Sequence, residues 1–293
     1  MNLQRSQCGL FLVVLLSVAC GLEPGSSQFD DQVIEAVDDN GEPLPDEALG
    51  EGTGAGTMAG TWMLAHQASS CVLGFEQVTH AYYLIEIEEA GAGLRETRTL
   101  CELSLTPLLG FTPVASQEVL ASIEFPPIDY GLLPTLLPGG TYTSSTEVGL
   151  WGVTLDNPVE DSLPTDPDDE RVIDGDGDGN PGVSMALEGS GCSRFMGQRQ
   201  IVRYFGTLQA PNDIRGQSAT VTDTVVYGAS GSVCQLAPAV DPNDALSQFR
   251  MVRVDGRGGS VQANDGEGPI TCEDIARFTD LILPVREADD EHC

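Results

Sequence analysis

The chain has 293 residues, 41% of them hydrophobic, so it can bury a sizeable core as one large domain or two small ones. Its 45 acidic residues face 13 basic ones, all arginine, and the formal net charge is −32. Such acidity argues strongly against nucleic acid as a partner, because phosphate binding needs a basic surface, and it favours divalent cations or basic proteins. The acidity also serves solubility by itself.

Residues 1–20 are typical of an export signal. Arg5 is the only charged residue before Glu23, and it is followed by an uncharged apolar run over residues 9–19. That run is too short to span a bilayer, whereas a short apolar core behind a basic start is the mark of a cleaved signal peptide. The sequence therefore predicts export from the cytoplasm.

The signal ends in small residues before Cys20, a pattern that resembles the lipobox at which lipoproteins are cleaved and acylated. We therefore predict lipidation of Cys20 and a membrane anchor in the cell envelope. The alternative is an ordinary secretory signal in which Cys20 is incidental. Gly21 stands where an aspartate would suggest retention in the inner membrane, so the resemblance implies the outer membrane or the cell surface.

Residues 21–57 are expected to form a disordered acidic tether. Between Gly21 and Gly56 the sequence has ten acidic residues, three prolines and no arginine. Such a segment cannot bury enough apolar surface to offset the entropy of ordering it. The folded body is therefore expected over residues 58–293.

The body shows apolar and polar residues in strict alternation, which predicts antiparallel strands with one face buried and one in water. Glycine-rich turns between many such segments favour an all-β fold with minor α content, either an antiparallel β-barrel or a sandwich. The strands are expected around residues 85–88, 101–105, 119–125, 183–187, 201–208, 219–227 and 249–254.

An acidic loop over residues 156–182 contains the sharpest motif. Asp174, Asp176 and Asp178 alternate with glycines and precede Asn180. The glycines let the backbone curl, so that these side chains can turn toward one hard cation such as calcium. The alternative is an acidic turn without a specific metal.

The motif departs from an EF-hand, because Met185 takes the twelfth position and a strand follows in place of a helix. It is similar to the D-x-D-x-D-G loops of thrombospondin type 3 repeats, which implies a structural calcium ion. Further ligands could come from main-chain carbonyls or from the preceding acidic residues Asp166, Asp168, Asp169 and Glu170.

One helix is expected over residues 271–283. Thr271 is placed as its N-cap with Asp274 three residues on, and Pro284 follows its end. Ile275 and Ile282 share one face, so the helix is expected to pack on the sheet.

Six cysteines remain after the predicted signal and Cys20, and an even number in an exported protein indicates disulfides. Six cysteines permit many pairings, and the sequential set is our prediction. The predicted pairs are Cys71 with Cys101, Cys192 with Cys234, and Cys272 with Cys293.

Catalytic motifs are not evident: the sequence has no G-x-S-x-G, no H-E-x-x-H and, without lysine, no phosphate-binding G-x-x-x-x-G-K. We assign no catalytic residue. His66 and His80 lie near predicted strands and could join a carboxylate in acid–base chemistry. The alternative is that neither histidine has a catalytic role.

Gly60, Thr61 and Trp62 are similar to the G-x-W that opens the first strand of lipocalins. The body from Gly60 to about Pro284 resembles an uncharacterised family of predicted lipoproteins from Gram-negative bacteria. The resemblance rests on the strand at Cys101, on residues 176–184, on Gln198 with Arg199, and on residues 247–249 with Arg253. It implies a lipid-anchored, calycin-like barrel.

Two functions are compatible with these features. The first is a lipid-anchored, noncatalytic envelope protein whose calcium-stabilised barrel binds an apolar small ligand or a protein partner. The second is an exported hydrolase that uses carboxylates with His66 or His80.

Overall fold

The computed structural model describes residues 56–91, 93–130, 135–235, 238–289, 291 and 293. The predicted signal peptide, Cys20, and the predicted tether up to residue 55 lie outside the described residues.

The described chain contains fourteen strands, three short α-helices and short 3₁₀ turns. The strands are β1 (Gly56–Thr57), β2 (Gly60–Val72), β3 (Phe75–Ala90), β4 (Gly93–Leu105), β5 (Thr112–Ala115), β6 (Ile128–Tyr130), β7 (Thr135–Leu136), β8 (Thr141–Thr143), β9 (Glu147–Trp151), β10 (Val183–Glu188), β11 (Cys192–Ala210), β12 (Asp213–Ala229), β13 (Val240–Pro242) and β14 (Gln248–Arg253). The helices are α1 (Gln117–Ser122), α2 (Cys272–Ala276) and α3 (Thr279–Ile282).

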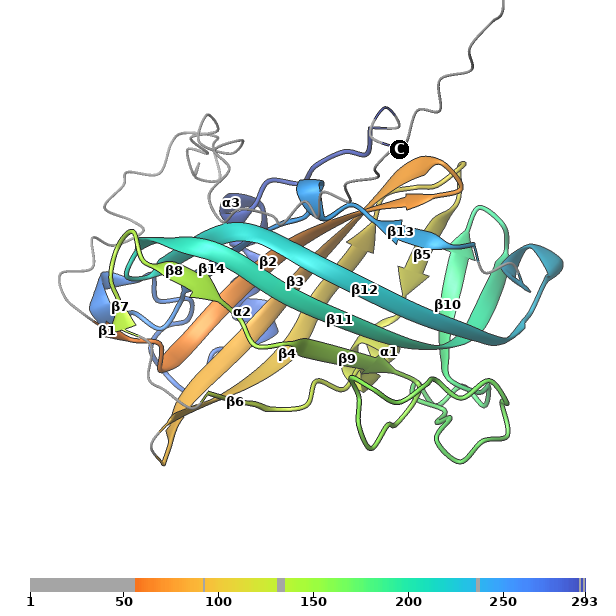
Figure 1. Ribbon diagram of the computed structural model, residues 1–293, viewed down its shortest axis with the longest axis horizontal. Helices are drawn as coiled ribbons and strands as arrows, with labels where there is room; N and C mark the ends of the chain where they lie inside the picture. The colour runs from red at the N-terminus through yellow and green to blue at the C-terminus, as the bar shows by residue number, and fades with distance from the viewer. Residues whose placement is uncertain (1–55, 92, 131–134, 236–237, 290, 292) are drawn as a thin grey trace, which may run out of the picture. The chain divides into compact units, whose positions relative to one another are not determined.

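Twelve strands form one antiparallel sheet in the order β5-β10-β11-β12-β14-β2-β3-β4-β6, with β8, β9 and β13 attached to it. The all-β fold with minor α content is therefore confirmed. The long hairpin of β11 and β12 passes in front of β2, β3 and β4 in Figure 1. Because β12 covers one edge of β11, the short strands β8, β9 and β10 follow one another along the other edge.

The sheet is not closed by hydrogen bonds among the described strands, because its order ends at β5 on one side and at β6 on the other. The predicted barrel is thus supported only as far as a curled antiparallel sheet. Side chains link strands across the opening, among them Arg98 of β4 and Glu147 of β9.

The predicted alternation is confirmed over residues 85–88 of β3, where Ile85 and Ile87 are buried and the two glutamates are exposed, but β2 is covered on both faces. Four consecutive residues of β2, Trp62 to Ala65, are at most 1% exposed, so both faces of this strand are covered. Trp62 and Leu64 belong to an inner core that the curled sheet encloses. Met63 and Ala65 belong to a second core on the outer face. A chain segment that follows β14 supplies the second cover.

That segment includes the predicted helix of residues 271–283, which is two short helices, α2 and α3, rather than one. The predicted capping box is confirmed, since Thr271 Oγ1 accepts from Asp274 N while the Asp274 carboxylate accepts from Thr271 N. Ile275 and Ile282 are buried against the outer face. The helical turns break at Arg277 and Phe278.

The predicted strand at residues 119–125 is also wrong, because α1 occupies most of it. Ser116 caps this helix by accepting a hydrogen bond from Val119 N. Val119 and Leu120 enter the inner core together with Ile123 just beyond the helix. The apolar positions satisfy helical spacing as well as period two, and the cap decides for the helix.

Candidate functional site

The predicted calcium motif forms a closed loop beside β11. Gly175 N donates to Gly182 O at 2.9 Å, and Gly182 N donates to Ile173 O at 3.0 Å, so the two ends of the loop are held together. Gly182 has a φ of +86°, and a Cβ there would lie 2.3 Å from Met196 O. Only glycine lets the loop lie this close to the strand.

Three carboxylates converge in the loop. Asp174, Asp176 and Asp178 each offer an oxygen, and these oxygens lie within 4.8 Å of one another. The Asp174 carboxylate also accepts the main-chain N–H groups of Asp178 and Gly179, at 3.1 and 2.9 Å. Asp176 Oδ1 is buried and has no hydrogen-bond partner among the described residues, so it is free to face a cation. The three carboxylates could hold a metal ion.

Asn180 braces this group by donating to the Asp178 carboxylate from its main chain at 2.8 Å and from its side chain at 3.0 Å. The Ser184 hydroxyl also donates to Asp178 and is the main reason why its pKa lies below the usual range. The predicted extra ligands Asp166, Asp168, Asp169 and Glu170 are not part of the three-carboxylate group in the described chain.

A second group of charged side chains lies inside the curled sheet. The side chains of Glu96, Arg98 and Glu147 are only 1%, 6% and 4% exposed. The Arg98 guanidinium donates to both carboxylates. It also lies 5.7 Å from the ring centroid of Tyr83 and 6.0 Å from that of Tyr204. Arg98 therefore ties β4 to β3, β9 and β11.

One arginine cannot neutralise two buried carboxylates, and an uncompensated buried charge is costly. Burial raises the pKa of Glu147 to about 8; Arg98 opposes the rise and Glu96 adds to it. Glu147 therefore holds a proton at neutral pH, and its Oε1 has no hydrogen-bond partner in the described part of the chain.

His66 lies in the inner core close to this group. Its Nε2 is 2.7 Å from Ser218 Oγ, and its Nδ1 is 3.4 Å from the Tyr204 hydroxyl. Burial first, and then the charge of Arg98, lowers the pKa of His66 to about 3, so the imidazole is neutral. Its hydrogen-bond partners within the described ranges include no carboxylate.

His80 does not join His66. In the antiparallel register Gln67 pairs with His80 and His66 pairs with Ala81, so the two histidines point to opposite faces of the sheet. His80 Nε2 meets the carbonyl oxygen of Arg286 at 3.2 Å. The structure does not bring the two histidines together.

The six cysteines form three disulfides, but only the predicted pair Cys192–Cys234 is confirmed. The other two pairings were predicted wrongly. Cysteines that follow one another in the sequence are kept apart by the sheet, because β3 lies between β2, which carries Cys71, and β4, which carries Cys101. The observed pairs are Cys71–Cys293 and Cys101–Cys272, which close 222 and 171 residues of sequence.

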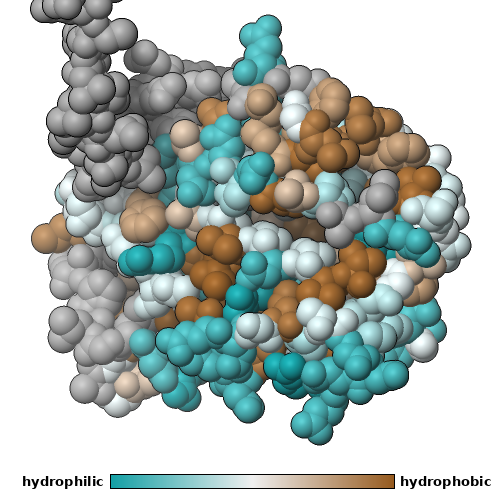
Figure 2. All heavy atoms as spheres, turned by 45° about the vertical axis from the view of Figure 1, so that its right-hand side comes forward, coloured by the Kyte–Doolittle hydropathy of each residue, from teal (hydrophilic) through white to brown (hydrophobic). Residues whose placement is uncertain are grey.

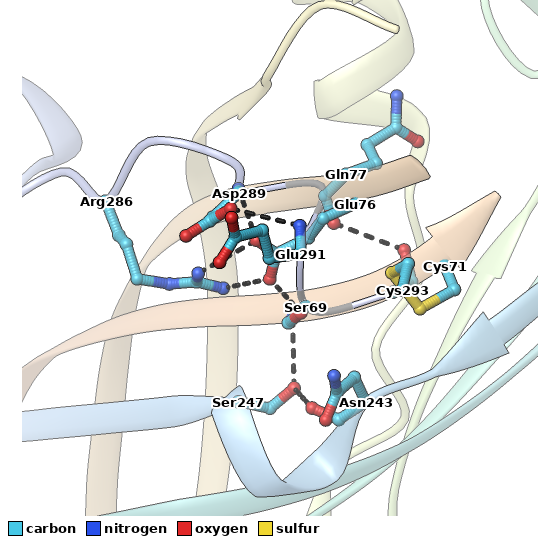
Figure 3. The surroundings of a disulfide bond; sticks show 11 residues. Ser69, Cys71, Glu76, Gln77, Asn243, Ser247, Arg286, Asp289, Glu291 and Cys293 are labelled. Atoms are coloured by element: carbon cyan, nitrogen blue, oxygen red, sulfur yellow. Dashed lines mark hydrogen bonds and ion pairs between the residues drawn. A yellow bond between two sulfur atoms is a disulfide. The ribbon is translucent and has the colours of Figure 1, made fainter. Parts of the chain in front are cut away.

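The Cys71–Cys293 disulfide lies beside a buried ion pair (Figure 3). The Glu76 carboxylate, on the neighbouring strand β3, is 0% exposed and pairs with the Arg286 guanidinium at 2.6 Å. It also accepts the Ser69 hydroxyl and the main-chain N–H of Asp289. This group fastens the C-terminal segment to the outer face of the sheet.

Two hollows lie at the surface of the described residues. One, of about 500 Å³, is lined by residues 186–189 and 191–193 around the turn between β10 and β11. The second lies between residues 263–269 and the start of α2. The end of the sheet that carries β10 comes forward in Figure 2, where hydrophobic and hydrophilic surface are interspersed.

Sequence reasoning missed the Glu96, Arg98 and Glu147 group. The sequence did contain a signal. Leu94, Glu96, Arg98 and Leu100 are every second residue of β4, so their side chains point to the same face, toward the inner core. Nothing in the local sequence brings Glu147 to them.

Comparison with protein-family models, curated proteins and solved structures finds no match for this chain. Among the described residues there is no helix of sufficient length and hydrophobicity to cross a membrane.

Proposed function

We propose that this chain is an exported, lipid-anchored envelope protein without catalytic activity, whose calcium-stapled β body binds a protein partner. The observation that carries the proposal is that all six cysteines of the body pair in disulfides. Such cross-links form and persist in oxidising compartments and are rare in the cytosol. The predicted signal and Cys20 supply the route and the anchor.

Calcium is the metal we propose for the loop of Asp174, Asp176 and Asp178. Calcium takes six to eight oxygen ligands in flexible geometry, and the three carboxylates supply the hard oxygens that it prefers. The unpartnered Asp176 Oδ1 supports this choice. The loop ties itself shut beside β11, so we propose a structural role for the ion.

A protein partner is favoured over an enclosed apolar ligand because side chains fill the inside of the sheet. Arg98, Glu147, His66 and Tyr204 meet there. Recovery of a tightly bound apolar molecule from the purified protein by organic extraction and mass spectrometry would contradict this part of the proposal.

The experiment that tests the anchor compares Cys20→Ser with Cys8→Ser, which changes the other cysteine of the predicted signal. Wild type and Cys8→Ser are expected to incorporate labelled palmitate and to sediment with membranes, whereas Cys20→Ser is expected to lose the label. A wild-type protein that is secreted without lipid would contradict the proposal and favour an ordinary secretory signal.

The alternative is an exported hydrolase. The contact of 2.7 Å between His66 and Ser218 favours it, because a neutral imidazole beside a hydroxyl is the arrangement of a base and a nucleophile. Both residues are buried, at 2% and 1% exposure, which disfavours it. Labelling of Ser218 by a fluorophosphonate probe would support this alternative.

A further inference from the structure

The C-terminal segment from Ile282 to Asp289 crosses the outer face of β14, β2 and β3, held by side chains rather than by strand pairing in the described sheet. Carbonyl oxygens of alternate residues each face one polar side chain, and each of these side chains comes from a different strand. The pairs are Ile282 O with Arg250 Nη1 (3.1 Å), Pro284 O with Gln67 Nε2, and Arg286 O with His80 Nε2 (3.2 Å).

These contacts bind the main-chain carbonyl oxygen of every second residue of the segment. Arg250, Gln67 and His80 are at most 3% exposed, so their polar groups are held away from water. A buried donor or acceptor that loses its partner costs about 1–3 kcal/mol. The three side chains therefore form a surface that needs an extended peptide on it.

Glu76 adds recognition of one side chain. Its carboxylate binds Arg286 through both terminal nitrogens, at 3.1 and 2.6 Å, and accepts Asp289 N at 2.7 Å (Figure 3). A forked arrangement of this kind is specific for arginine. The surface thus fits a segment with an arginine at the position of the third carbonyl.

The disulfide Cys71–Cys293 then locks the end of the segment. The other cysteine near the C-terminus, Cys272, lies before the segment and is fixed to Cys101 of β4. The segment from Ile282, the last residue of α3, to Asp289 is therefore a separate arm, which lies between one cross-link to the sheet at Cys272 and a second at Cys293.

We propose that this surface, formed by Arg250, Gln67, His80 and Glu76, is a binding site for the C-terminal arm that accepts the arm of a second copy as well as its own. Every contact is the same whichever copy supplies the arm, so reciprocal exchange gives a symmetric pair. Two interchain Cys71–Cys293 disulfides then link the copies. This inference goes beyond the proposed function and does not rest on it.

Concentration decides between the two arrangements. A tethered arm competes with an effective concentration on the order of millimolar. Exchange therefore grows with chain concentration while the disulfides form. Each disulfide forms as two thiols transfer two electrons to oxidised glutathione, which leaves as two thiols.

The test mixes equal amounts of natural-abundance and ¹⁵N-labelled chains, reduced and unfolded, and refolds them with glutathione at rising chain concentration. Mass spectrometry of the disulfide-linked peptides is expected to find mixed-isotope pairs at Cys71–Cys293 that increase with concentration. The pairs Cys101–Cys272 and Cys192–Cys234 are expected to stay within one isotope. No mixing at Cys71–Cys293, or equal mixing at all three disulfides, would overturn the proposal.

A second measurement combines two variants, Cys71→Ser and Cys293→Ser, neither of which can close its own disulfide. Together they are expected to form one interchain Cys71–Cys293 bond, seen as a covalent dimer on a non-reducing gel. Adding Glu76→Gln to the Cys71-bearing chain is expected to lower the dimer yield at least about tenfold, since it removes the carboxylate that recognises Arg286. Glu86→Gln, an exposed position on the same strand, is the matched control; an equal loss there would contradict recognition by Glu76.

Discussion

Arg98 is the residue on which the inside of the sheet depends most. Among the described residues it is the cation that contacts Glu96 and Glu147 beside the buried Tyr83, Tyr142 and Tyr204, and its charge also contributes to keeping His66 neutral. A buried charge pair gives little net stability compared with apolar packing, but loss of one partner leaves the other as an uncompensated buried charge. The residues around Arg98 are thus coupled.

Glu147 should give the unfolding free energy a distinctive pH dependence. Its pKa is about 8 in the folded protein against an ordinary value of 4.5, so between these values the folded state holds a proton that the unfolded state has lost. The contribution of Glu147 to the free energy of unfolding is therefore fully present below the unfolded-state pKa and is lost as pH rises through the folded-state pKa. The loss is at most about 1.4 kcal/mol per pH unit.

The measurement is urea unfolding of wild type and Glu147→Gln across this pH range, followed by fluorescence of the buried Trp62 and Trp151. The variant is expected to lose the downward slope with rising pH. Glu86→Gln, at an exposed site, should keep it. If Glu147→Gln and wild type show the same slope, Glu147 is ionised in the folded protein at neutral pH.

At the scale of elements, the loop of Asp174 to Gly182 joins the region after β9 to β10 and packs against β11. Calcium bound there would hold three carboxylates that otherwise repel one another. A ligand that binds only the folded state stabilises it by about 2.7 kcal/mol at a concentration of 100 times its dissociation constant. That free energy appears as a higher melting temperature.

We expect calcium to raise the melting temperature of the wild type after treatment with EDTA, and Asp176→Asn combined with Asp178→Asn to abolish the rise. Differential scanning calorimetry measures it. Asp168→Asn, in the same acidic region but outside the three-carboxylate group, serves as control and should respond like the wild type. A wild type whose melting temperature is the same in EDTA and in calcium would contradict a structural calcium site.

For the whole molecule, the large negative charge is not balanced by local contacts. Eight of the thirteen arginines pair with carboxylates in the described chain, yet 45 acidic residues are present. Most acidic residues in the part of the chain that the structure describes therefore have no ion pair with an arginine. Like charges confined to a compact body repel each other, which lowers the stability of the folded state.

Screening should relieve this repulsion. The Debye length shrinks from about 30 Å at 0.01 M salt to about 8 Å at 0.15 M, so sodium chloride is expected to raise the melting temperature over this range. Each 1 kcal/mol of relief corresponds to roughly 2–4 °C for a domain of this size. Choline chloride should act equally, which distinguishes screening from specific binding of sodium ions. A melting temperature that falls with either salt would contradict the argument.

The sequence by itself determined the elements whose signal lies within a few residues. Period-two alternation correctly located β10, β11, β12 and β14, and the Thr271–Asp274 capping box located the start of α2. Spacing of the aspartates also located the carboxylate loop at Asp174. At residues 119–125 two periods fit the same apolar residues, and the Ser116 cap settled the choice for a helix. The export signal lies outside the described residues and stays a prediction.

The tertiary structure alone decided which distant residues meet. Cys71 meets Cys293 because the C-terminal arm crosses the outer face of the sheet at β2. Arg98 meets Glu147 because the curled sheet brings β4 and β9 to face each other across its opening. The second covered face of β2 has the same origin, since the chain after β14 folds back over it. Alternation within a strand fixes which side chains share a face, but each face acquires its neighbours only when the sheet curls and the arm crosses it.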